Sequence, residues 1–599
     1  MSLPDTNVSP RWDLTPAFPS LDSPEFASEY AELLDLIGQL TKQFDDSGVR
    51  RRESPEVTPE LTSQVEAVIA NWNTLYNRLS VMFSFLHCII TTDAKDEATK
   101  ARLSELETKT IVLSTLSTRL VAWVGSSDVE ALLASSQIVR DHEFWLRRAQ
   151  TLSSHQMSEA EENLIASLHP MGYGAWGKLH GDMSALLTAE VELDGALQTL
   201  PMSAIRALAS HPDRSVRERA FNAEQKAWPT VALPLAAALN GIKGFGREAR
   251  VRRGWSDDLE PTLLRNSIDQ KTLDAMQGAC VESFPDFRRY MKAKARALGV
   301  EQLAWYDLIA PVGGEGEKWN WEACEEVIET NFARYSDKMA TFARRSFDEN
   351  WIDAEPRVGK VGGAYCTGYG DGDSRILMNF DGSFTQISTL AHELGHAYHN
   401  LCLKGRTPLQ KGIPMTLAET ASIFCETLVF EAAVEKASPE EKLFLLDNAL
   451  SRNLQVVVDI HSRFLFESRV FEKRAERELG ESEFSELMMQ AQRETYGEDL
   501  SPIHPYMWAV KGHYYGANFY NYPYTFGLLF ALGLYARYRE NPDEFRAKYD
   551  DFLSRCGLGD AATLASDFGI DTTTPDFWRS SLDIIREQID EFEALVPTN

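Results

Sequence analysis

Residues 381–400 read DGSFTQISTLAHELGHAYHN and are the most informative stretch of the chain. Ser383 and Gln386 form the pattern of a capping box at the start of a helix. They follow an Asp-Gly pair, which favours a turn. Gly405, shortly beyond Cys402, is a typical stop signal. The stretch therefore predicts an amphipathic helix that ends at about Cys402.

The predicted helix contains the motif HExxH, as His392-Glu393-Leu394-Gly395-His396. Because each helical residue turns by about 100°, the two histidines lie one turn apart on one face, so both imidazoles can bind one ion. Glu393 lies beside them, near enough to accept a proton from a water molecule at the metal. The motif predicts one catalytic zinc ion bound by His392 and His396, with Glu393 as general base. The alternative is a structural helix with incidental histidines.

A catalytic zinc ion normally has three protein ligands, and two residues compete for the third place. His399 shares the face of His392 but lies ~10.5 Å further along the helix, so three rings converge on one ion only with difficulty. Glu419 lies in residues 416–426 (TLAETASIFCE), a second apolar helical segment. A carboxylate from a neighbouring helix closes the site more naturally, and we expect Glu419 to be the third ligand.

Glu426 follows Glu419 by seven residues in the same predicted helix and therefore shares its face. A carboxylate there is expected to hydrogen-bond a ligand imidazole from outside the coordination sphere. The alternative is an ordinary solvated or salt-bridged helix residue.

Helical periodicity dominates the rest of the chain. Apolar residues recur at the spacing of one helix face in two N-terminal segments, as in Leu33, Leu34, Ile37, Leu40 and Phe44 and again in Leu61, Val65, Val68, Ile69 and Trp72. Alternating apolar and polar residues are scarce and are clearest in 375–380 (RILMNF). The sequence predicts a mainly α protein with one small sheet near residues 355–380.

Length and composition exclude several classes of protein. The chain has 599 residues, of which 44% are hydrophobic and 25% charged, as is usual for a globular protein with a large core. Lys and Arg number 60 against 89 Asp and Glu, which gives a net charge of −29. So acidic a chain repels phosphate backbones and anionic lipids, so we expect neither nucleic-acid nor membrane partners.

The cysteines and the start of the chain indicate where the protein resides. The seven cysteines are scattered, are odd in number and include no Cys-x-x-Cys pair. This is typical of reduced thiols rather than of a disulfide framework. Residues 1–14 have no basic segment followed by an apolar one, so no signal peptide is expected. We expect a soluble, cytoplasmic protein of unknown oligomeric state.

The chain as a whole resembles the oligoendopeptidase F branch of the thimet-oligopeptidase-like zinc metallopeptidases. The opening Trp12-Asp13-Leu14 resembles the start of that family, and LAHELGHAYH at 390–399 resembles its catalytic core. Glu419-Thr420-Ala421-Ser422 matches the place of the family's glutamate ligand, which independently favours Glu419. His513–Gly527 (HYYGANFYNYPYTFG) resembles its His- and Tyr-rich segment.

The resemblance implies a two-lobed helical fold, with a small β-sheet beside the HExxH helix and a deep channel that admits short peptides. It implies a zinc-dependent endopeptidase that hydrolyses peptide bonds in oligopeptides. The implied domains are an N-terminal helical region (1–115), a helical domain of the oligopeptidase F N-terminal type (116–200) and a catalytic domain (201–599).

Donors besides the metal are needed for the oxyanion that forms during hydrolysis. His513, Tyr520 and Tyr522 are the expected donors, since imidazole and phenol donate without adding fixed negative charge. Tyr520 and Tyr522 are preferred by their family position, and which tyrosine acts stays open. The alternative is an aromatic core helix.

Peptide substrates also need a surface that holds their main chain. Gly363, Ala364 and Tyr365 precede the metal helix and resemble part of the family's catalytic core. Together with strand 375–380 they are expected to bind an extended peptide at a free strand edge, which ignores side-chain identity. The alternative is a purely structural hairpin.

Two other functions compete with the endopeptidase. A zinc carboxypeptidase of similar helical fold would use the same HExxH chemistry. A peptide-binding protein with an inactive or structural metal site would bind peptides without turnover. The intact Glu393 and the third carboxylate disfavour this last alternative.

Overall fold

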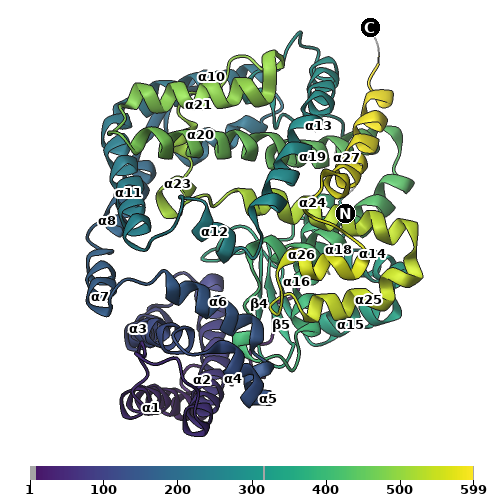
Figure 1. Ribbon diagram of the computed structural model, residues 1–599. Helices are drawn as coiled ribbons and strands as arrows, with labels where there is room; N and C mark the ends of the chain where they lie inside the picture. The colour runs from purple at the N-terminus through teal and green to yellow at the C-terminus, as the bar shows by residue number, and fades with distance from the viewer. Residues whose placement is uncertain (1–8, 315–317, 598–599) are drawn as a thin grey trace. The chain divides into compact units, whose positions relative to one another are not determined.

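The computed structural model describes residues 9–314 and 318–597. Residues 1–8, which form part of the segment used to predict the absence of a signal peptide, lie outside the described residues. The chain forms two compact units (Figure 1). The first unit comprises Met1–Gln156, Glu317–Ala432 and Arg537–Gly569, and the second comprises Met157–Gly316, Ala433–Ala536 and Ile570–Asn599. Both are mainly helical, which confirms the predicted fold class.

The first unit contains the elements that carry the HExxH motif and the small sheet. Its elements are α1 (Pro24–Asp46), α2 (Pro59–Thr92), α3 (Glu97–Gly125), α4 (Val129–Ser135), α5 (Gln137–Arg140), α6 (Glu143–Ser154), α14 (Trp321–Tyr335), α15 (Asp337–Asp348), β3 (Ile352–Asp353), β4 (Tyr365–Gly368), β5 (Ser374–Leu377), α16 (Phe384–Cys402), η4 (Pro408–Gln410), α17 (Met415–Ala418), α18 (Thr420–Lys436), α25 (Pro542–Ser554), α26 (Ala561–Ala565) and η7 (Ser566–Phe568). Helix α18 continues into the second unit beyond Ala432.

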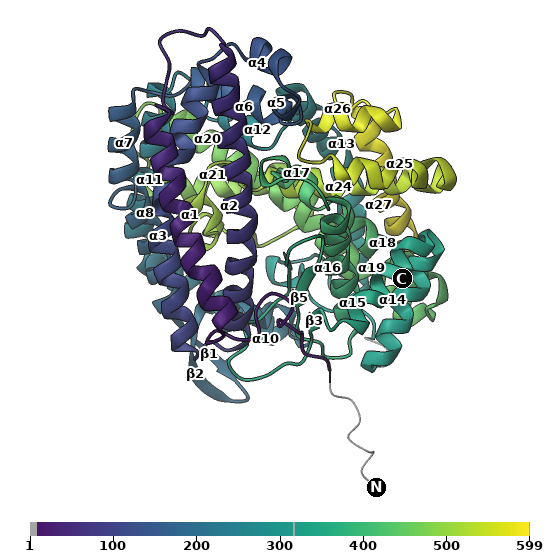
Figure 2. The same cartoon turned by 90° about the horizontal axis from the view of Figure 1, so that it is seen from below.

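The N-terminal helices pack through the faces that the sequence indicates. Leu33, Ile37, Leu40 and Phe44 of α1 are buried in one core with Val65, Val68 and Trp72 of α2 and with residues of α3 and α6. Figure 2 shows α1, α2 and α3 as long helices side by side. The apolar spacing of these segments therefore identified both the helices and their buried faces.

The predicted sheet has three strands in the order β3-β5-β4. Strand β5 is parallel to β3 and antiparallel to β4. It therefore lies at the centre, where both of its edges are paired. The prediction that strand 375–380 offers a free edge was wrong, because β3 covers the edge that β4 leaves. The outer edge next to α16 belongs to β4.

The second unit carries the His- and Tyr-rich segment. Its elements are α7 (Glu159–Leu168), α8 (Tyr173–Leu186), β1 (Thr188–Leu193), β2 (Ala196–Pro201), α9 (Met202–Ala207), η1 (Leu208–Ser210), α10 (Arg214–Ala227), η2 (Trp228–Thr230), α11 (Ala232–Arg252), α12 (Glu260–Arg265), α13 (Gln270–Ala297), η3 (Trp305–Asp307), α19 (Pro439–Leu454), the π-helical turn η5 (Gln455–Asp459), α20 (Ile460–Arg474), α21 (Glu481–Tyr496), η6 (Gly497–Asp499), α22 (Met507–Val510), α23 (His513–Gly516), α24 (Tyr522–Glu540) and α27 (Pro575–Leu595).

A hairpin in this unit was not predicted from the sequence. Strands β1 and β2 pair antiparallel and are joined by Asp194 and Gly195, both at positive φ (52° and 77°). An Asp-Gly pair of this kind favours a two-residue hairpin turn. The alternation of Ala189, Val191 and Leu193 with polar residues was therefore a usable strand signal.

No helix among the described residues is both long and apolar enough to cross a membrane.

Candidate metal centre

Helix α16 presents the HExxH motif and begins where the sequence predicts. The Ser383 side chain caps the helix by accepting a hydrogen bond from the backbone N–H of Gln386, and the helix ends at Cys402. Gly405, just beyond, has a φ of +84°, which glycine adopts without strain. The prediction of this helix and of both its ends is confirmed.

Three predicted ligand side chains converge in the first unit. The Nε2 atoms of His392 and His396 lie 3.3 Å and 3.4 Å from the Glu419 Oε2 atom. One ligand atom of each residue lies within 4.8 Å of the others, and each side chain is half-buried. Two imidazoles and one carboxylate are a donor set that suits a divalent transition metal.

Glu419 reaches the cluster from a break between two helices. Residues 416–426 do not form the one continuous helix that was predicted: α17 ends at Ala418 and α18 begins at Thr420. The backbone oxygen of Glu419 accepts the first bond of α18, from Ile423. Ser422 Oγ lies 2.7 Å from Glu419 Oε2 and donates a hydrogen bond to it. Glu419 is therefore held by its own backbone and by a neighbouring hydroxyl.

Gly395, inside the HExxH motif, lets α16 approach this break closely. A Cβ atom on Gly395 would lie 2.5 Å from the Ala421 carbonyl oxygen and 2.5 Å from Ser422 Cα. Both are backbone atoms, so no side chain can turn aside to make room. The absence of a side chain at Gly395 thus sets the distance between the two histidines and Glu419.

Glu426, on α18, orients His392. Its Oε2 atom lies 3.2 Å from His392 Nδ1, and Ser388 Oγ donates to its Oε1 atom at 3.1 Å. Burial opposes the protonation of His392, but the carboxylates of Glu419 and Glu426 outweigh it and raise its pKa to about 10. The site thus has a surplus of negative charge that a cation would neutralise.

Glu393 lies beside the cluster on α16 and is buried. Burial raises the pKa of its carboxyl group above the usual value, although His392 and His396 oppose the shift. Within the described chain, its carboxylate makes neither a hydrogen bond nor an ion pair. Such a group is free to accept a proton from a substrate water.

His399, the competing third ligand, has another partner. Its Nε2 atom lies 3.1 Å from the backbone oxygen of Leu553, to which it donates, and the ring is buried. Burial lowers its pKa to about 4. His399 therefore packs neutral against α25 rather than joining the three-residue cluster.

The predicted substrate-binding residues lead into strand β4, which packs against α16. Asn379 holds the loop before the strand by donating to the Gly363 carbonyl at 3.1 Å. The Tyr365 hydroxyl is 2.7 Å from Thr91 Oγ1, so this side chain is already engaged. Tyr365 is opposite Leu377 of β5, whose main chain faces β4 because Ile376 and Met378 donate to the opposite side. The Tyr365 main chain is therefore taken up by β5, and the predicted main-chain role of this residue is wrong. Ala364 and Cys366 face the edge that is not paired with β5.

His513 and Tyr520 lie together in the second unit. The His513 Nδ1 atom is 2.8 Å from Asn521 Oδ1, and its ring centroid is 4.8 Å from that of Tyr520. Because the Asn521 oxygen only accepts, His513 donates from Nδ1. Tyr524 donates to the Tyr520 hydroxyl at 3.3 Å. Burial lowers the pKa of His513.

Tyr522 has different surroundings. It opens α24, is buried, and its hydroxyl lies 3.1 Å from Asn266 Nδ2 and 3.3 Å from Thr262 Oγ1. Burial raises its pKa to about 12. The structure thus brings His513 and Tyr520 together and gives Tyr522 separate partners.

Three supporting residues were missed in the sequence. Ser388 and Ser422 donate to Glu426 and Glu419, and Asn521 fixes the ring of His513. Ser422 lies three residues after Glu419, a spacing that allows their contact. Ser388 lies one helical turn before His392 and so shares the face that meets Glu426 of α18. Nothing in the sequence indicates Asn521, because its contact depends on the irregular path between α23 and α24.

Gly395→Ala is expected to destabilise the protein and weaken metal binding. Alanine gains up to ~1 kcal/mol in helix propensity. Overpacking against fixed backbone costs ~1–3 kcal/mol or more, so the net free energy of unfolding should fall. The matched control is Gly38→Ala in α1, where a Cβ meets nothing within 4 Å and stability should rise. Denaturant unfolding and metal titration of both variants measure the effect. Equal stability changes would contradict the close approach.

Comparisons with known proteins identify the family of the chain. Peptidase family M3 matches residues 207–584, and oligopeptidase F matches residues 124–188. The oligoendopeptidase F homolog of Lactococcus lactis subsp. lactis (strain IL1403) is 25% identical over 483 residues, which cover 78% of each chain. The group B oligopeptidase PepB of Streptococcus agalactiae serotype III (strain NEM316) is 23% identical over 98% of this chain and 97% of its own.

A solved structure shares the fold. The oligoendopeptidase-F of Enterococcus faecium superposes with a TM-score of 0.70 at 18% identity, over 96% of this chain and 99% of that chain. The M3 match covers more than half of the sequence and includes the whole HExxH helix and Glu419. The chain belongs to peptidase family M3, in its oligoendopeptidase F branch, and is a metalloendopeptidase.

Proposed function

We propose that this protein is a zinc-dependent endopeptidase that hydrolyses peptide bonds in short oligopeptides. The observation that carries the proposal is the spacing of the ligand atoms of His392, His396 and Glu419. Zinc bonds of about 2.0–2.1 Å at tetrahedral angles place neighbouring ligand atoms ~3.3–3.4 Å apart. The distances to Glu419 Oε2 are 3.3 Å and 3.4 Å, so the residues fit this ion.

Glu393 is the proposed general base. When bound, the metal supplies Lewis acidity, which polarises a carbonyl group and acidifies water. The buried Glu393 carboxylate takes the proton of the attacking water and passes it to the leaving nitrogen. The raised pKa of Glu393 supports this role, because it makes the carboxylate a stronger base toward the proton of the attacking water.

The outer edge of β4 is the proposed binding surface for the substrate main chain. Ala364 and Cys366 would pair with an extended peptide by backbone hydrogen bonds, and Gly363 shapes the approach with a φ of +83°. Cys366 of the same strand lies close to Glu393. Burial raises the pKa of the Cys366 thiol, and the negative charge of the Glu393 carboxylate adds to that shift. The strand therefore lies close to the proposed base.

His513 and Tyr520 are proposed to donate hydrogen bonds to the oxyanion of the substrate. Their adjacent rings and the partial burial of Tyr520 support this role. Tyr522 is the second tyrosine of the proposal, and substrate would have to compete with Asn266 and Thr262 for its hydroxyl.

We also propose the domains 1–115, 116–200 and 201–599 and a cytoplasmic location. The family matches at 124–188 and 207–584 fall within the second and third domains. The seven cysteines, all of which are free, support a reducing compartment.

An internally quenched peptide of about ten residues, blocked at both termini, tests the function. We expect cleavage within the peptide, complete loss of cleavage after a chelator removes the metal, and recovery when zinc is added back. Mass spectrometry of the products locates the cut, and the same sequence with free termini is the control.

The two competing functions give different outcomes. A carboxypeptidase would cleave only the peptide with a free C-terminus. A binding protein would shift the fluorescence anisotropy of the peptide and leave it intact. Either result would refute the proposed endopeptidase on short peptides.

A further inference from the structure

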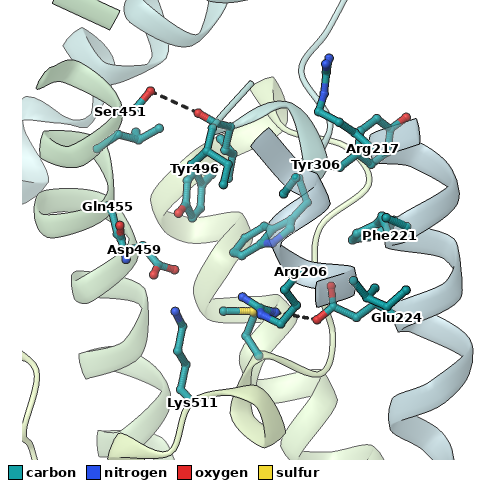
Figure 3. Close-up of a pocket in the computed structure, with 18 residues that line it drawn as sticks. Arg206, Arg217, Phe221, Glu224, Tyr306, Ser451, Gln455, Asp459, Tyr496 and Lys511 are labelled. Atoms are coloured by element: carbon teal, nitrogen blue, oxygen red, sulfur yellow. Dashed lines mark hydrogen bonds and ion pairs between the residues drawn. The ribbon is translucent and has the colours of Figure 1, made fainter. Parts of the chain in front are cut away.

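The second unit contains a pocket of its own, lined only by residues of that unit (Figure 3). Its volume is about 180 Å³, the size of a small organic molecule. The walls come from α9, α10, the end of α19, α21 and α22. The apolar part of the lining includes Ile205, Phe221, Trp305, Leu308, Leu454 and Met507. A ligand there would bury an apolar body.

The charged groups of the pocket are mostly neutralised already. Each lining carboxylate has a cationic partner: Glu224 pairs with Arg206 at 2.5 Å, and Asp459 pairs with Arg463. The lining Arg217 is also paired, with Asp307 at 3.0 Å. Glu224 also accepts a hydrogen bond from Trp228 at 3.1 Å. No lining carboxylate is therefore left to bind a cationic ligand.

Lys511 is the exception among the charged groups. Its ammonium group makes no hydrogen bond and no ion pair with the described residues. In Figure 3 the Lys511 side chain points toward Asp459, which Arg463 already engages. Burial and the charge of Arg463 lower the pKa of Lys511 to about 8. An unpaired, partly buried cation is costly, and an anion at this point would remove the cost.

The backbone of the pocket is unusual at the same place. Gln455 and Asp459 both line it, and they are the two ends of the π-helical turn η5 between α19 and α20. Such turns are rare and are frequent at functional sites, because they displace side chains from the regular helical position. The turn aims two polar residues of one helix into the pocket that Lys511 faces.

We propose that this pocket binds a small monocarboxylic acid with an apolar body, with the Lys511 ammonium as the counter-ion. The unpaired cation selects an anion, and the apolar wall selects its hydrocarbon part. A free amino acid fits less well, since the lining carboxylates that its ammonium group needs are already paired. None of the residues that line the pocket belongs to the proposed peptidase machinery. The proposal of a carboxylate site therefore does not depend on the proposed function.

Calorimetric titration of the holoenzyme with 4-methylpentanoate tests the proposal. We expect saturable binding, and binding at least about 10-fold weaker for leucine and for 4-methylpentanamide, which has the same shape and no charge. Lys511→Met should lower the affinity for 4-methylpentanoate by about 10- to 100-fold, the range of one charge-assisted hydrogen bond. Lys226→Met, at an exposed position of α10 outside the pocket lining, is the matched control and should bind as the unmodified protein does.

A second measurement distinguishes this pocket from a carboxylate that binds at the metal centre. An amine-reactive reagent at pH 8, read by peptide mass spectrometry, should modify Lys511, and saturating 4-methylpentanoate should protect that residue at least about 5-fold. Lys226 should react equally with and without the acid. Absence of protection, tighter binding of leucine or of the amide, or unchanged affinity in Lys511→Met would each overturn the proposal.

Discussion

Glu393→Gln is expected to reduce kcat by on the order of 10³-fold while the protein keeps its metal. Glutamine preserves the size of the side chain but cannot take a proton from the attacking water. A positioned general base typically contributes about 10²- to 10⁴-fold, which sets this magnitude. Because Glu393 lies beside the ligand cluster without belonging to it, metal affinity should change little. Stopped-flow cleavage of a quenched peptide and metal analysis of the same sample measure both quantities.

The matched control is Glu435→Gln, an exposed glutamate on α18, which should keep full activity. Glu393→Asp retains the carboxylate but withdraws it by one methylene group, so its activity should lie between those of the glutamine variant and the unmodified protein. A Glu393→Gln enzyme that keeps more than about a tenth of its turnover with the metal bound would exclude Glu393 as the general base.

Glu419→Ala is expected to lose nearly all bound zinc. It removes one of the three converging donors and leaves two imidazoles, which do not fill a catalytic zinc site. His399→Ala should keep its zinc, because that ring donates to the Leu553 carbonyl. Glu426→Ala should fall between them, since loss of a hydrogen-bond partner outside the coordination sphere costs about 10- to 100-fold in affinity.

Inductively coupled plasma mass spectrometry of the three purified variants gives the zinc content, and chelator competition gives the affinities. Circular dichroism controls for folding, because His399 is buried and its removal also costs stability. Zinc loss in His399→Ala together with zinc retention in Glu419→Ala would replace Glu419 by His399 as the third ligand.

The helices and the centre of the site could be predicted because they depend on short-range patterns. The capping residue Ser383 and the stop signal at Gly405 fix α16 locally, and the spacing of His392 and His396 follows from helix geometry. In α1, the apolar period placed Leu33 and Phe44 correctly in the core.

The features that were missed depend on tertiary contacts. The central position of β5 follows from its pairing with β3, which contributes only Ile352 and Asp353 and has no strand pattern of its own. The break at Glu419 occurs inside an apolar helical run that contains no proline or glycine. The β1–β2 hairpin is different: its turn signal at Asp194-Gly195 was present in the sequence and was overlooked.

The division of the chain into two units has a consequence for how the enzyme can fail. His392, His396, Glu419, Glu426 and Ser388 all belong to the first unit, whereas the proposed oxyanion donors belong to the second. Metal binding and the proposed stabilisation of the oxyanion therefore depend on separate stretches of the chain. An enzyme that has lost its metal and an enzyme that keeps its metal but does not turn over give the same result in an activity assay. The two defects arise from substitutions in different parts of the sequence, and measuring the metal content distinguishes them.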